Sequence, residues 1–253
     1  MPEGLVLESA VVSISGPRPE NQDVGVAGRR VLAVADGVGG HVAGEVAARL
    51  VADVMSADEG NVAAGVARAN ERLGAAVVAD PRLTGMATTL TAAELVGEEL
   101  VVAHIGDSRA YLLHDGQLQQ LTHDQTVVQS LVDSGVITPD EARTHPLRSI
   151  VLGALRGADD DLAHLETSSH PVEAGDRVLV CSDGLSGVVP PETLARLLAS
   201  DRRPAAAATH LVRAALAAGT HDNVTAVVAD VLVLAPVQAH LKAGTTRPFT
   251  FVA

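Results

Sequence analysis

Four aspartates stand where a carboxylate could bind a divalent cation. Asp36 and Asp183 each end an apolar run and are followed by a glycine, and Asp107 and Asp222 lie in short polar turns. A glycine lets the backbone approach an ion or a phosphate closely. Each setting is also that of an ordinary turn, because Asp-Gly and Asp-Asn are common turn dipeptides. Their recurrence along one chain favours a shared divalent metal site.

The number of carboxylates bears on what such a site must contain. Two carboxylates that converge to about 4 Å repel by about 4 kcal/mol at an effective dielectric constant near 20. That arrangement needs bound cations or raised pKa values. Oxygen ligands without a histidine–cysteine cluster favour Mg²⁺ or Mn²⁺ over Zn²⁺. Two such ions about 3.5–4 Å apart can hold a water and lower its pKa, which provides a nucleophile for attack on phosphorus.

Other chemistries have weaker support in the residues. The chain has no glycine-rich loop ending in Gly-Lys-Ser or Gly-Lys-Thr, which argues against a P-loop nucleotidase. Ser108 faintly resembles a nucleophile elbow, but a strand and not a helix is predicted to follow it. Cys181 lies in an apolar strand, where a buried and unreactive thiol is expected. His41 is expected to be a capping or surface residue, and His221 a turn residue.

Composition limits the class of protein. The 253 residues are 47% hydrophobic and 19% charged, which is typical of a globular protein, and aromatics are only 1%, so the core must be aliphatic. The net charge of −13 argues against nucleic acid or an anionic membrane surface as partner. It does not exclude a phosphorylated substrate, because bound cations reverse the local sign. The single cysteine and the absence of a signal peptide or a bilayer-length apolar segment predict a soluble, cytoplasmic protein.

Apolar periodicity predicts the elements that position the aspartates. Residues 31–36 are predicted as a strand buried on both faces. Residues 41–55 follow as a helix whose core-facing stripe is Val46, Leu50 and Val54. The other predicted strands are 5–15 (an edge strand), 86–95, 100–105, 110–113, 117–121, 177–182 and 224–234, and the other predicted helices are 61–79, 125–134, 191–199 and 204–218.

The chain is predicted to form a single domain over residues 1–235. Residues 122–161 are more polar and interrupt a series of strands, so we interpret them as a flap subdomain. Within this flap, Thr138-Pro139-Asp140-Glu141 predicts a capping box with proline at the first helical position. Asp115-Gly116 predicts a tight hairpin. The tail, 236–253, contains both phenylalanines of the chain, and we expect a frayed terminus there rather than a docking element.

Six motifs together resemble one family. The chain is similar to the metal-dependent PP2C-type serine/threonine protein phosphatases in their bacterial form, in motifs that follow the family's order and cover about residues 9–233. The motifs are Arg18-x-x-Asn21-x-Asp23, Val34-Ala35-Asp36-Gly37-Val38-Gly39-Gly40-His41, Gly85-Met86-Ala87-Thr88-Thr89, Gly106-Asp107-Ser108-Arg109, Ser182-Asp183-Gly184 and Asp222-Asn223-Val224-Thr225. The resemblance implies an α+β fold, a four-layer α-β-β-α sandwich of two antiparallel β-sheets flanked by helices. Strands that are apolar on both faces agree with that expectation.

The resemblance also implies roles for the aspartates. Asp36 would bridge two Mn²⁺ or Mg²⁺ ions, with the Gly37 carbonyl completing the first ion's ligands. Asp183 and Asp222 would bind the second ion. Asp107, together with Asp183, would bind a weaker third ion.

Two further residues have implied roles beside the metals. Arg18 would hold the substrate phosphate through its fork of donors, and Asp23 would orient site waters or Arg18. The flap would influence substrate choice. Val38 stands where animal members have a histidine proposed as general acid, so the proton donor for the leaving group is unassigned. Gln22 replaces a glutamate found in many members, and Ser149 replaces a frequent asparagine.

The expected activity is hydrolysis of phosphoserine and phosphothreonine on proteins by a metal-bridging water or hydroxide, without a phosphoenzyme. The expected partners are proteins phosphorylated by serine/threonine kinases, with no nucleic acid and no membrane, and the expected state is a monomer. Two alternatives stay open. One is a catalytically weak scaffold of the same fold that binds phosphoproteins, and the other is a phosphatase dedicated to one anti-sigma-factor antagonist.

Overall fold

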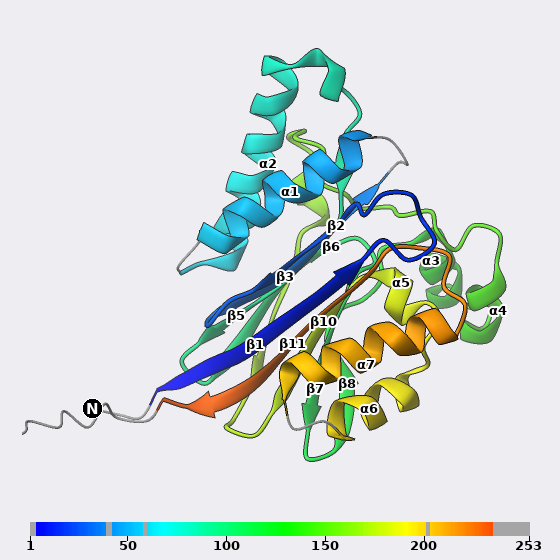
Figure 1. Ribbon diagram of the computed structural model, residues 1–253. Helices are drawn as coiled ribbons and strands as arrows, with labels where there is room; N and C mark the ends of the chain where they lie inside the picture. Colours follow the sequence, from blue (N-terminus) through cyan, green and yellow to red (C-terminus); the bar gives the residue numbers. More distant parts are fainter. Residues whose placement is uncertain (1–3, 39–41, 58–59, 201–202, 235–253) are drawn as a thin grey trace, which may run out of the picture.

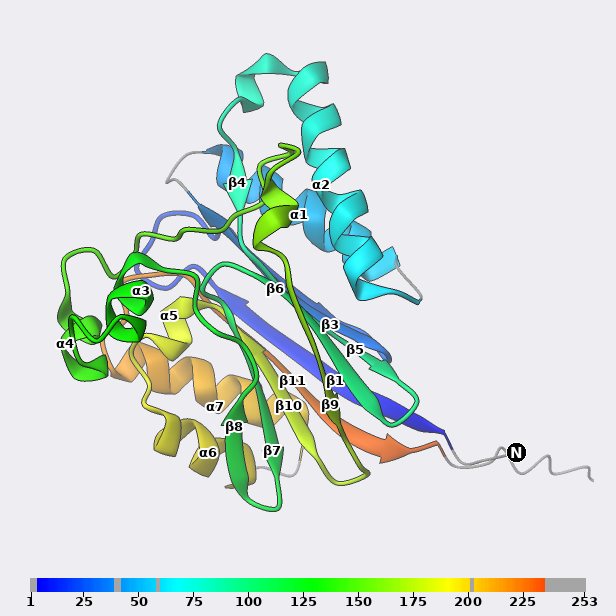
Figure 2. The same ribbon diagram turned by 180° about the vertical axis from the view of Figure 1, so that it is seen from behind.

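The computed structural model describes residues 4–38, 42–57, 60–200 and 203–234. Two antiparallel β-sheets lie face to face, and helices cover both outer faces (Figures 1 and 2). The predicted four-layer sandwich is therefore confirmed. Gly39, Gly40 and His41, together with the tail 236–253, lie outside the described residues.

Each sheet combines strands that are distant in the sequence. The first sheet has the order β1 (Leu5–Ile14), β11 (Val224–Val233), β10 (Arg177–Cys181), β7 (Arg109–His114) and β8 (Gln117–Gln120). The second has the order β2 (Asp23–Ala27), β3 (Val31–Val38), β5 (Leu90–Val96), β6 (Glu99–Ile105) and β9 (Glu166–Pro171), and β4 (Ala87–Thr88) also pairs with β3. β1 lies at the edge of the first sheet, as predicted.

The helices divide between the two outer faces and the flap. α1 (Val42–Ala57) and α2 (Val62–Ala79) cover the second sheet, and α6 (Pro191–Ser200) and α7 (Pro204–Ala217) cover the first (Figure 1). The flap contains α3 (Val127–Asp133) and α4 (Pro139–Thr144), and α5 (Asp183–Ser186) follows β10. The short 3₁₀ helices are Pro81–Leu83 and Asp161–His164. Within the described ranges, none of the helices is long and apolar enough to cross a bilayer.

The strand β3 is apolar on both of its faces because each face packs against another layer of the sandwich. Leu32 and Val34 face the space between the two sheets, where they join a cluster of aliphatic side chains. Val31, Ala33 and Ala35 face the opposite way, under α1 and α2. All five are buried, because both faces of the sheet are covered.

The predicted stripe of α1 packs against the core, but it is not the most buried face of the helix. Val46, Leu50 and Val54 are only partly buried, and the fully buried face consists of Ala47, Ala48, Val51, Ala52 and Met55. Alanines at the contact let the helix approach β3 closely.

Local turn and cap signals are confirmed. Asp115 and Gly116 both have positive φ, 47° and 76°, as a type I′ hairpin turn requires. The Thr138 hydroxyl accepts a hydrogen bond from the Glu141 N–H, and the Glu141 carboxylate accepts one from the Thr138 N–H. Cys181 is fully buried, and burial raises the pKa of its thiol to about 12. The cysteine is therefore unreactive in the folded protein, as expected.

Two strands were not predicted from the sequence. β2 follows a loop directly and contains Gly25, and β9 is a polar strand with the sequence ETSSHP. Both are edge strands of the second sheet. An edge strand needs little apolar alternation, because one of its sides faces no neighbouring strand. The predicted strand 86–95 is also interrupted at Thr89, between β4 and β5.

Candidate active site

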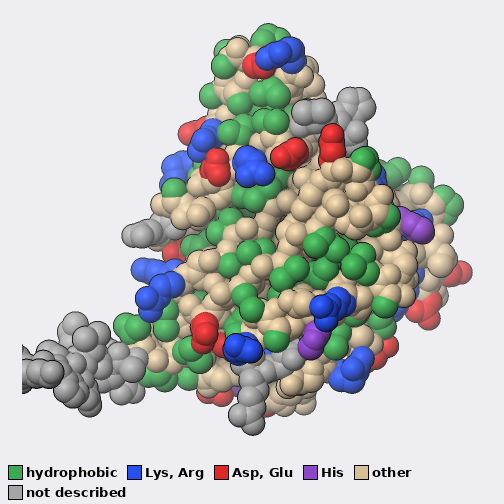
Figure 3. Space-filling model, in the orientation of Figure 1, with side chains coloured by type: hydrophobic (Ala, Val, Ile, Leu, Met, Phe, Trp, Pro, Cys, Tyr) green, Lys and Arg blue, Asp and Glu red, His purple; other side chains and the backbone are tan. Residues whose placement is uncertain are grey.

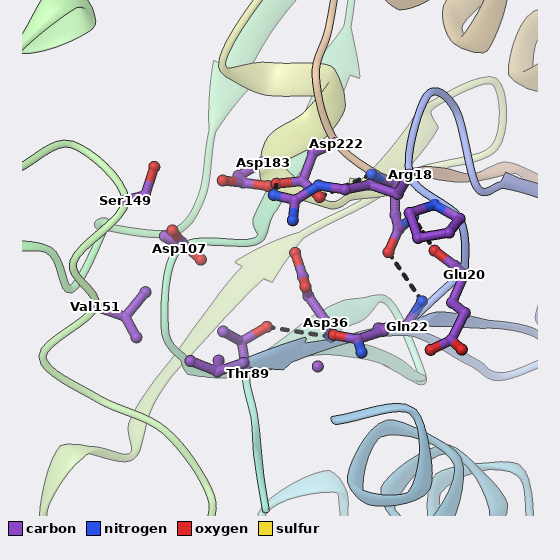
Figure 4. Close-up of a pocket in the computed structure, with 14 residues that line it drawn as sticks. Arg18, Glu20, Gln22, Asp36, Thr89, Asp107, Ser149, Val151, Asp183 and Asp222 are labelled. Atoms are coloured by element: carbon purple, nitrogen blue, oxygen red, sulfur yellow. Dashed lines mark hydrogen bonds and ion pairs between the residues drawn. The ribbon is translucent and has the colours of Figure 1, made fainter. Parts of the chain in front are cut away.

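The sequence-predicted aspartates converge on one cavity of about 240 Å³. It lies where β3 of the second sheet and the ends of β10 and β11 of the first sheet meet (Figure 4). The predicted residues that line it are Arg18, Asp36, Gly37, Asp107, Asp183 and Asp222. Asp23 is adjacent, directly opposite Asp36 in the β2–β3 register. Residues up to 204 positions apart in the chain therefore meet in one site.

Different elements deliver the four carboxylates. Asp36 lies within β3, which continues to Val38, two residues beyond the predicted end of this strand. Asp183 is the first residue of α5, directly after β10. Asp107 lies in the turn between β6 and β7, and Asp222 lies in the turn between α7 and β11. Each carboxylate is carried by a strand or by a short connection anchored to one, which holds it in a defined position.

Asp36 lies at the electrostatic centre of the site. Burial, followed by the negative charges of Asp23, Asp183, Asp107 and Asp222, raises its pKa well above the ordinary value. Figure 4 shows its carboxylate pointing into the cavity. A carboxylate surrounded by other carboxylates favours its neutral form unless cations compensate the charge.

Asp107 and Asp183 are affected in the same direction. Burial, then the charge of Asp183, raises the pKa of Asp107 well above its ordinary range. Burial, then the charge of Asp222, raises the pKa of Asp183 to about 6. Arg109 compensates Asp107 only in part, because its guanidinium binds Asp124 through two hydrogen bonds of 2.7 and 2.6 Å. The site therefore holds an excess of negative charge.

Asp23 lies beneath the cavity and carries an unsatisfied oxygen. The Ser182 hydroxyl donates to its Oδ2 at 2.7 Å, while Oδ1 is buried and has no hydrogen-bond partner among the described residues. Burial raises the pKa of Asp23 to about 6. Arg18, which Asp23 was expected to orient, is bound to Asp222 instead.

Arg18 extends over the mouth of the cavity from the loop before β2 (Figure 4). Its Nη2 donates to Asp222 Oδ2 at 2.9 Å, and its Nε donates to the His221 carbonyl at 3.0 Å. The side chain is 51% exposed, so the guanidinium is accessible from solvent. A guanidinium has five N–H donors, which leaves several for an incoming anion.

Asn223 is a structural residue of the site whose role the sequence did not reveal. Its Nδ2 donates to the carbonyls of Ser15 and Glu20, and its Oδ1 accepts from the Gln22 N–H at 2.9 Å. It therefore holds the loop that carries Arg18 against the turn that carries Asp222. The Asp-Asn motif was the available signal. The hydrogen bonds of Asn223 join residues about 200 positions apart, and contacts of that range leave no pattern in the local sequence.

Thr88 and Thr89 hold the backbone of Asp36. The Thr88 hydroxyl and the Thr89 N–H both donate to the Asp36 carbonyl, at 2.9 and 2.8 Å, and the Thr89 hydroxyl accepts from the Asp36 N–H. The motif containing these threonines was recognised in the sequence without a role. Both threonines are buried, so their hydroxyls serve to fix the metal-site strand.

Two glycines allow neighbouring backbone segments of the site to approach each other closely. A Cβ on Gly37 would lie 2.6 Å from the backbone of Gly44, in the first turn of α1. A Cβ on Gly184 would collide with the Asn223 carbonyl. Gly37 was expected for its exposed carbonyl, and the structure adds that helix and strand can meet here only without a side chain.

The flap contributes Ser149 and Val151 to the cavity wall, and β3 contributes Val38. Figure 4 places Ser149 and Val151 on the side opposite Arg18. Ser108 is buried and hydrogen-bonds Thr89, and β7 follows it, so it is not a nucleophile elbow. Among the described residues lining the cavity, none is a cysteine or a histidine.

The donor set fits hard divalent cations. Four carboxylates and a glycine backbone border one cavity, and burial and mutual repulsion raise the pKa of three of these carboxyls. Oxygen-only ligands of this kind suit Mg²⁺ and Mn²⁺. The unsatisfied Asp23 Oδ1 adds a further acceptor beside the cavity.

A second group of ligand-type side chains lies away from this cavity, where the end of β7 meets the connection between β9 and β10. Ligand atoms of His114, Glu173 and Asp176 lie within 4.8 Å of one another. His114 Nδ1 is 2.7 Å from Asp176 Oδ1, and this contact raises the pKa of the imidazole. Asp176 Oδ2 also accepts from the Glu173 N–H. Ion pairing and hydrogen bonding thus account for these contacts.

Comparisons with known proteins agree with this geometry. The family model described as Protein phosphatase 2C matches residues 21–218. The serine/threonine protein phosphatase PstP of Mycobacterium tuberculosis is 46% identical over 238 residues, which are 90% of this chain and 46% of PstP. The serine/threonine phosphatase Stp of Listeria monocytogenes is 33% identical over 224 residues, 83% of this chain and 86% of Stp. The chain thus spans about half the length of PstP and most of Stp.

A solved structure has the same fold and contains metal. The crystal structure of the catalytic domain of PstP in complex with two manganese ions superposes with a TM-score of 0.82 at 44% identity, covering 90% of this chain and 99% of that one. Family model, relatives and fold agree, and the chain belongs to the protein phosphatase 2C family.

Proposed function

We propose that this chain hydrolyses phosphoserine and phosphothreonine esters on proteins in a reaction that depends on Mn²⁺ or Mg²⁺. The convergence of Asp36, Asp107, Asp183 and Asp222 on one cavity, with Arg18 at its mouth, is the observation that carries the proposal. The activity in the names of PstP and Stp supports it. Retention of the whole carboxylate set favours an enzyme over a scaffold that only binds phosphoproteins.

In this proposal the aspartates hold the ions. Asp36 would contact two of them, with the Gly37 carbonyl on the first and Asp183 and Asp222 on the second. Asp107 and Asp183 would hold a weaker third. When bound, such ions lower the pKa of a coordinated water and offset the charge of the phosphate. The manganese in the PstP complex supports this choice of metal.

Other residues position the substrate. Arg18 would bind the phosphate oxygens through its free N–H donors, and Asn223 would hold the Arg18 loop in register with the metal site. Ser149 and Val151 of the flap would contact the residues around the phosphorylated side chain. Val38 is apolar and donates no proton, and Cys181 is buried with a raised pKa, so neither supplies an acid or a nucleophile.

The cellular setting is part of the proposal. We place the chain in the cytoplasm, acting as a monomer on proteins phosphorylated by serine/threonine kinases. A free, fully buried Cys181 suits a reducing compartment.

Metal removal tests the proposed activity. Phosphoserine and phosphothreonine peptides and p-nitrophenyl phosphate should be hydrolysed with Mn²⁺, and chelation by EDTA should lower the rate by at least about 100-fold, since a catalytic metal contributes several kcal/mol. Adding excess Mn²⁺ should restore it. Asp159→Asn, which changes an exposed aspartate outside the cavity, should behave like the wild type. Equal rates with Mn²⁺ and with EDTA contradict the proposal.

Replacing Arg18 tests phosphate binding. Arg18→Ala should lower kcat/KM for phosphopeptides by about 10- to 100-fold, mainly through KM, because charge-assisted hydrogen bonds to the phosphate are lost. Arg18→Lys should recover only part of the loss, since an ammonium cannot form the bidentate contact. Arg82→Ala removes an exposed arginine that pairs with Asp80, far from the cavity, and should have no effect. An unchanged KM for Arg18→Ala would exclude the assigned role.

A further inference from the structure

A second cavity, of about 420 Å³, lies between the edge strand β2 and the C-terminal half of α1. Val24 and Val26 of β2 form one wall, and Ala52 and Met55 of α1 form the other. Figures 1 and 2 show α1 running across the β2–β3 hairpin, the two elements that supply this lining. It is larger than the cavity of the candidate active site, and none of the aspartates of that site lines it.

The backbone of β2 is arranged to accept another strand. The Gly37 N–H bonds the Gln22 carbonyl, and the Gly28 N–H bonds the Val31 carbonyl, at the two ends of the β2–β3 ladder. In an antiparallel ladder, hydrogen-bonded and non-hydrogen-bonded pairs alternate. Val24 and Val26 therefore bond β3, while Gly25 and Ala27 direct their N–H and C=O groups away from it.

These outward groups form a short recognition edge. β2 is the terminal strand of its sheet, so no described strand pairs with that side of it. Unpaired edges of this kind bind extended peptides by adding a strand. The edge offers two residues, Gly25 and Ala27, each with one donor and one acceptor.

The side chains of the cavity define what would fit. Val24 and Val26 are partly buried against the core under α1, and Ala52 and Met55 are buried. An added strand would turn alternate side chains toward this wall, because successive residues of a strand point to opposite faces. Bulky apolar residues two positions apart would fill it.

The tail of this chain has that pattern. In an extended conformation, Phe249-Thr250-Phe251-Val252 would have both phenylalanines of the protein on one face, and residues 235–253 contain no acidic residue. Aromatic residues are otherwise almost absent from the chain, where Tyr111 is the only other one.

The tail also starts near the cavity. The described chain ends at Leu234, whose N–H bonds the Gly4 carbonyl, and the Leu7 N–H bonds the carbonyl of Arg29, which lines the cavity. β1 thus joins the end of β11 to the β2–β3 turn, and Figure 1 shows both at the same end of the sandwich. The contacts of Leu234 with Gly4 and of Arg29 with Leu7 are only a few residues apart along β1. Residues 235–248 can span about 45 Å when extended, at about 3.3 Å per residue, so the tail is long enough to reach from one contact to the other.

We propose that residues 249–252 add to β2 as an extra strand, with Phe249 and Phe251 in the cavity against α1. The sequence alone favours a frayed terminus, because it shows no surface on which the phenylalanines could be buried. The cavity and the open edge of β2 supply that surface. The tail would then cover the exposed edge of the second sheet, which otherwise invites pairing with other chains.

Nuclear magnetic resonance on the full chain tests the proposal. In the wild type, amide hydrogens of Gly25 and Ala27 should exchange at least about 10-fold more slowly than in the variant Phe249→Ser/Phe251→Ser, because a bonded edge is protected. Val24 and Val26 amides, which bond β3, should exchange alike in both. Thr250→Ala changes the side chain on the opposite face and should keep the protection.

A second measurement detects the contact between the phenylalanine rings and α1 directly. With two phenylalanines and three methionines in the chain, nuclear Overhauser effects between the phenylalanine rings and the Met55 methyl can be assigned, and they are expected in the wild type. Equal exchange at Gly25 and Ala27 in the wild type and the double variant overturns the proposal, as does the absence of these effects. Protection that grows with protein concentration also overturns it, because the occupant is then a second copy.

Discussion

Asp36→Asn is expected to abolish Mn²⁺ binding and lower phosphatase turnover by at least about 100-fold, while it raises the stability of the metal-free protein. The loss of activity follows because this carboxylate would contact both ions, and removing a group that directly stabilises charge costs on the order of 100- to 1000-fold or more. The gain in stability follows because Asp36 is buried among Asp23, Asp183, Asp107 and Asp222, whose repulsion the neutral amide removes. In EDTA, the variant should therefore melt at a higher temperature than the wild type.

The stability of the metal-free protein should also depend on pH in a defined direction. Asp23 and Asp183 have folded-state pKa values of about 6, above their ordinary value of 3.8. The folded state therefore binds more protons than the unfolded state between about pH 4 and 6, and its stability falls as the pH rises through this window. In EDTA, the melting temperature should be higher at pH 5.5 than at pH 7.5, and Asp36→Asn should reduce that difference.

Calorimetric Mn²⁺ titration, turnover and thermal denaturation in EDTA measure the three effects separately. Asp159→Asn, an exposed aspartate outside the cavity, is the matched control and should change none of them. Wild-type turnover in Asp36→Asn would show that Asp36 is not a metal ligand. A melting temperature in EDTA below that of the wild type would show that the cluster is not destabilising.

Gly184→Ala is expected to damage the site without touching a single ligand atom. The new Cβ would collide with the Asn223 carbonyl and lie 3.4 Å from the Asp222 Cβ. Backbone meets backbone here, so the start of α5, which carries Asp183, must move away from the turn that carries Asp222. We expect a loss of about 1–3 kcal/mol in the free energy of unfolding, typical of overpacking. Turnover should fall by about 10- to 100-fold, because small misplacements of catalytic groups cost that much.

Gly4→Ala provides the control for this substitution, since a Cβ there meets nothing within 4 Å. Chemical denaturation measures the stability change, and Mn²⁺ titration of the folded variant shows whether the two aspartates still act together. Wild-type stability combined with wild-type Mn²⁺ affinity would contradict the close approach of Gly184 and Asn223.

Much of the fold was accessible from the sequence because its signals are local. The buried run before Asp36, the Asp115-Gly116 hairpin and the Thr138 capping box each depend on the φ/ψ preferences or polarity of neighbouring residues. The strands β2 and β9 were not predicted, because edge strands need no alternation of apolar and polar residues. The most buried face of α1 was missed because it contains small residues, Ala47 and Ala48, which a hydrophobicity pattern alone does not weigh.

The candidate site divides in the same way. The sequence by itself determined which side chains can do chemistry: aspartates at strand ends next to glycines, in motifs that resemble one phosphatase family. Only the tertiary structure decided that Asp36, Asp107, Asp183 and Asp222 share one cavity, that Arg18 pairs with Asp222, and that Asn223 holds the two loops together. The physical reason is the distance along the sequence over which each interaction acts. Local patterns set the backbone conformation within a few residues. The convergence of the charged side chains comes from the packing of two sheets whose strands are paired across the whole chain.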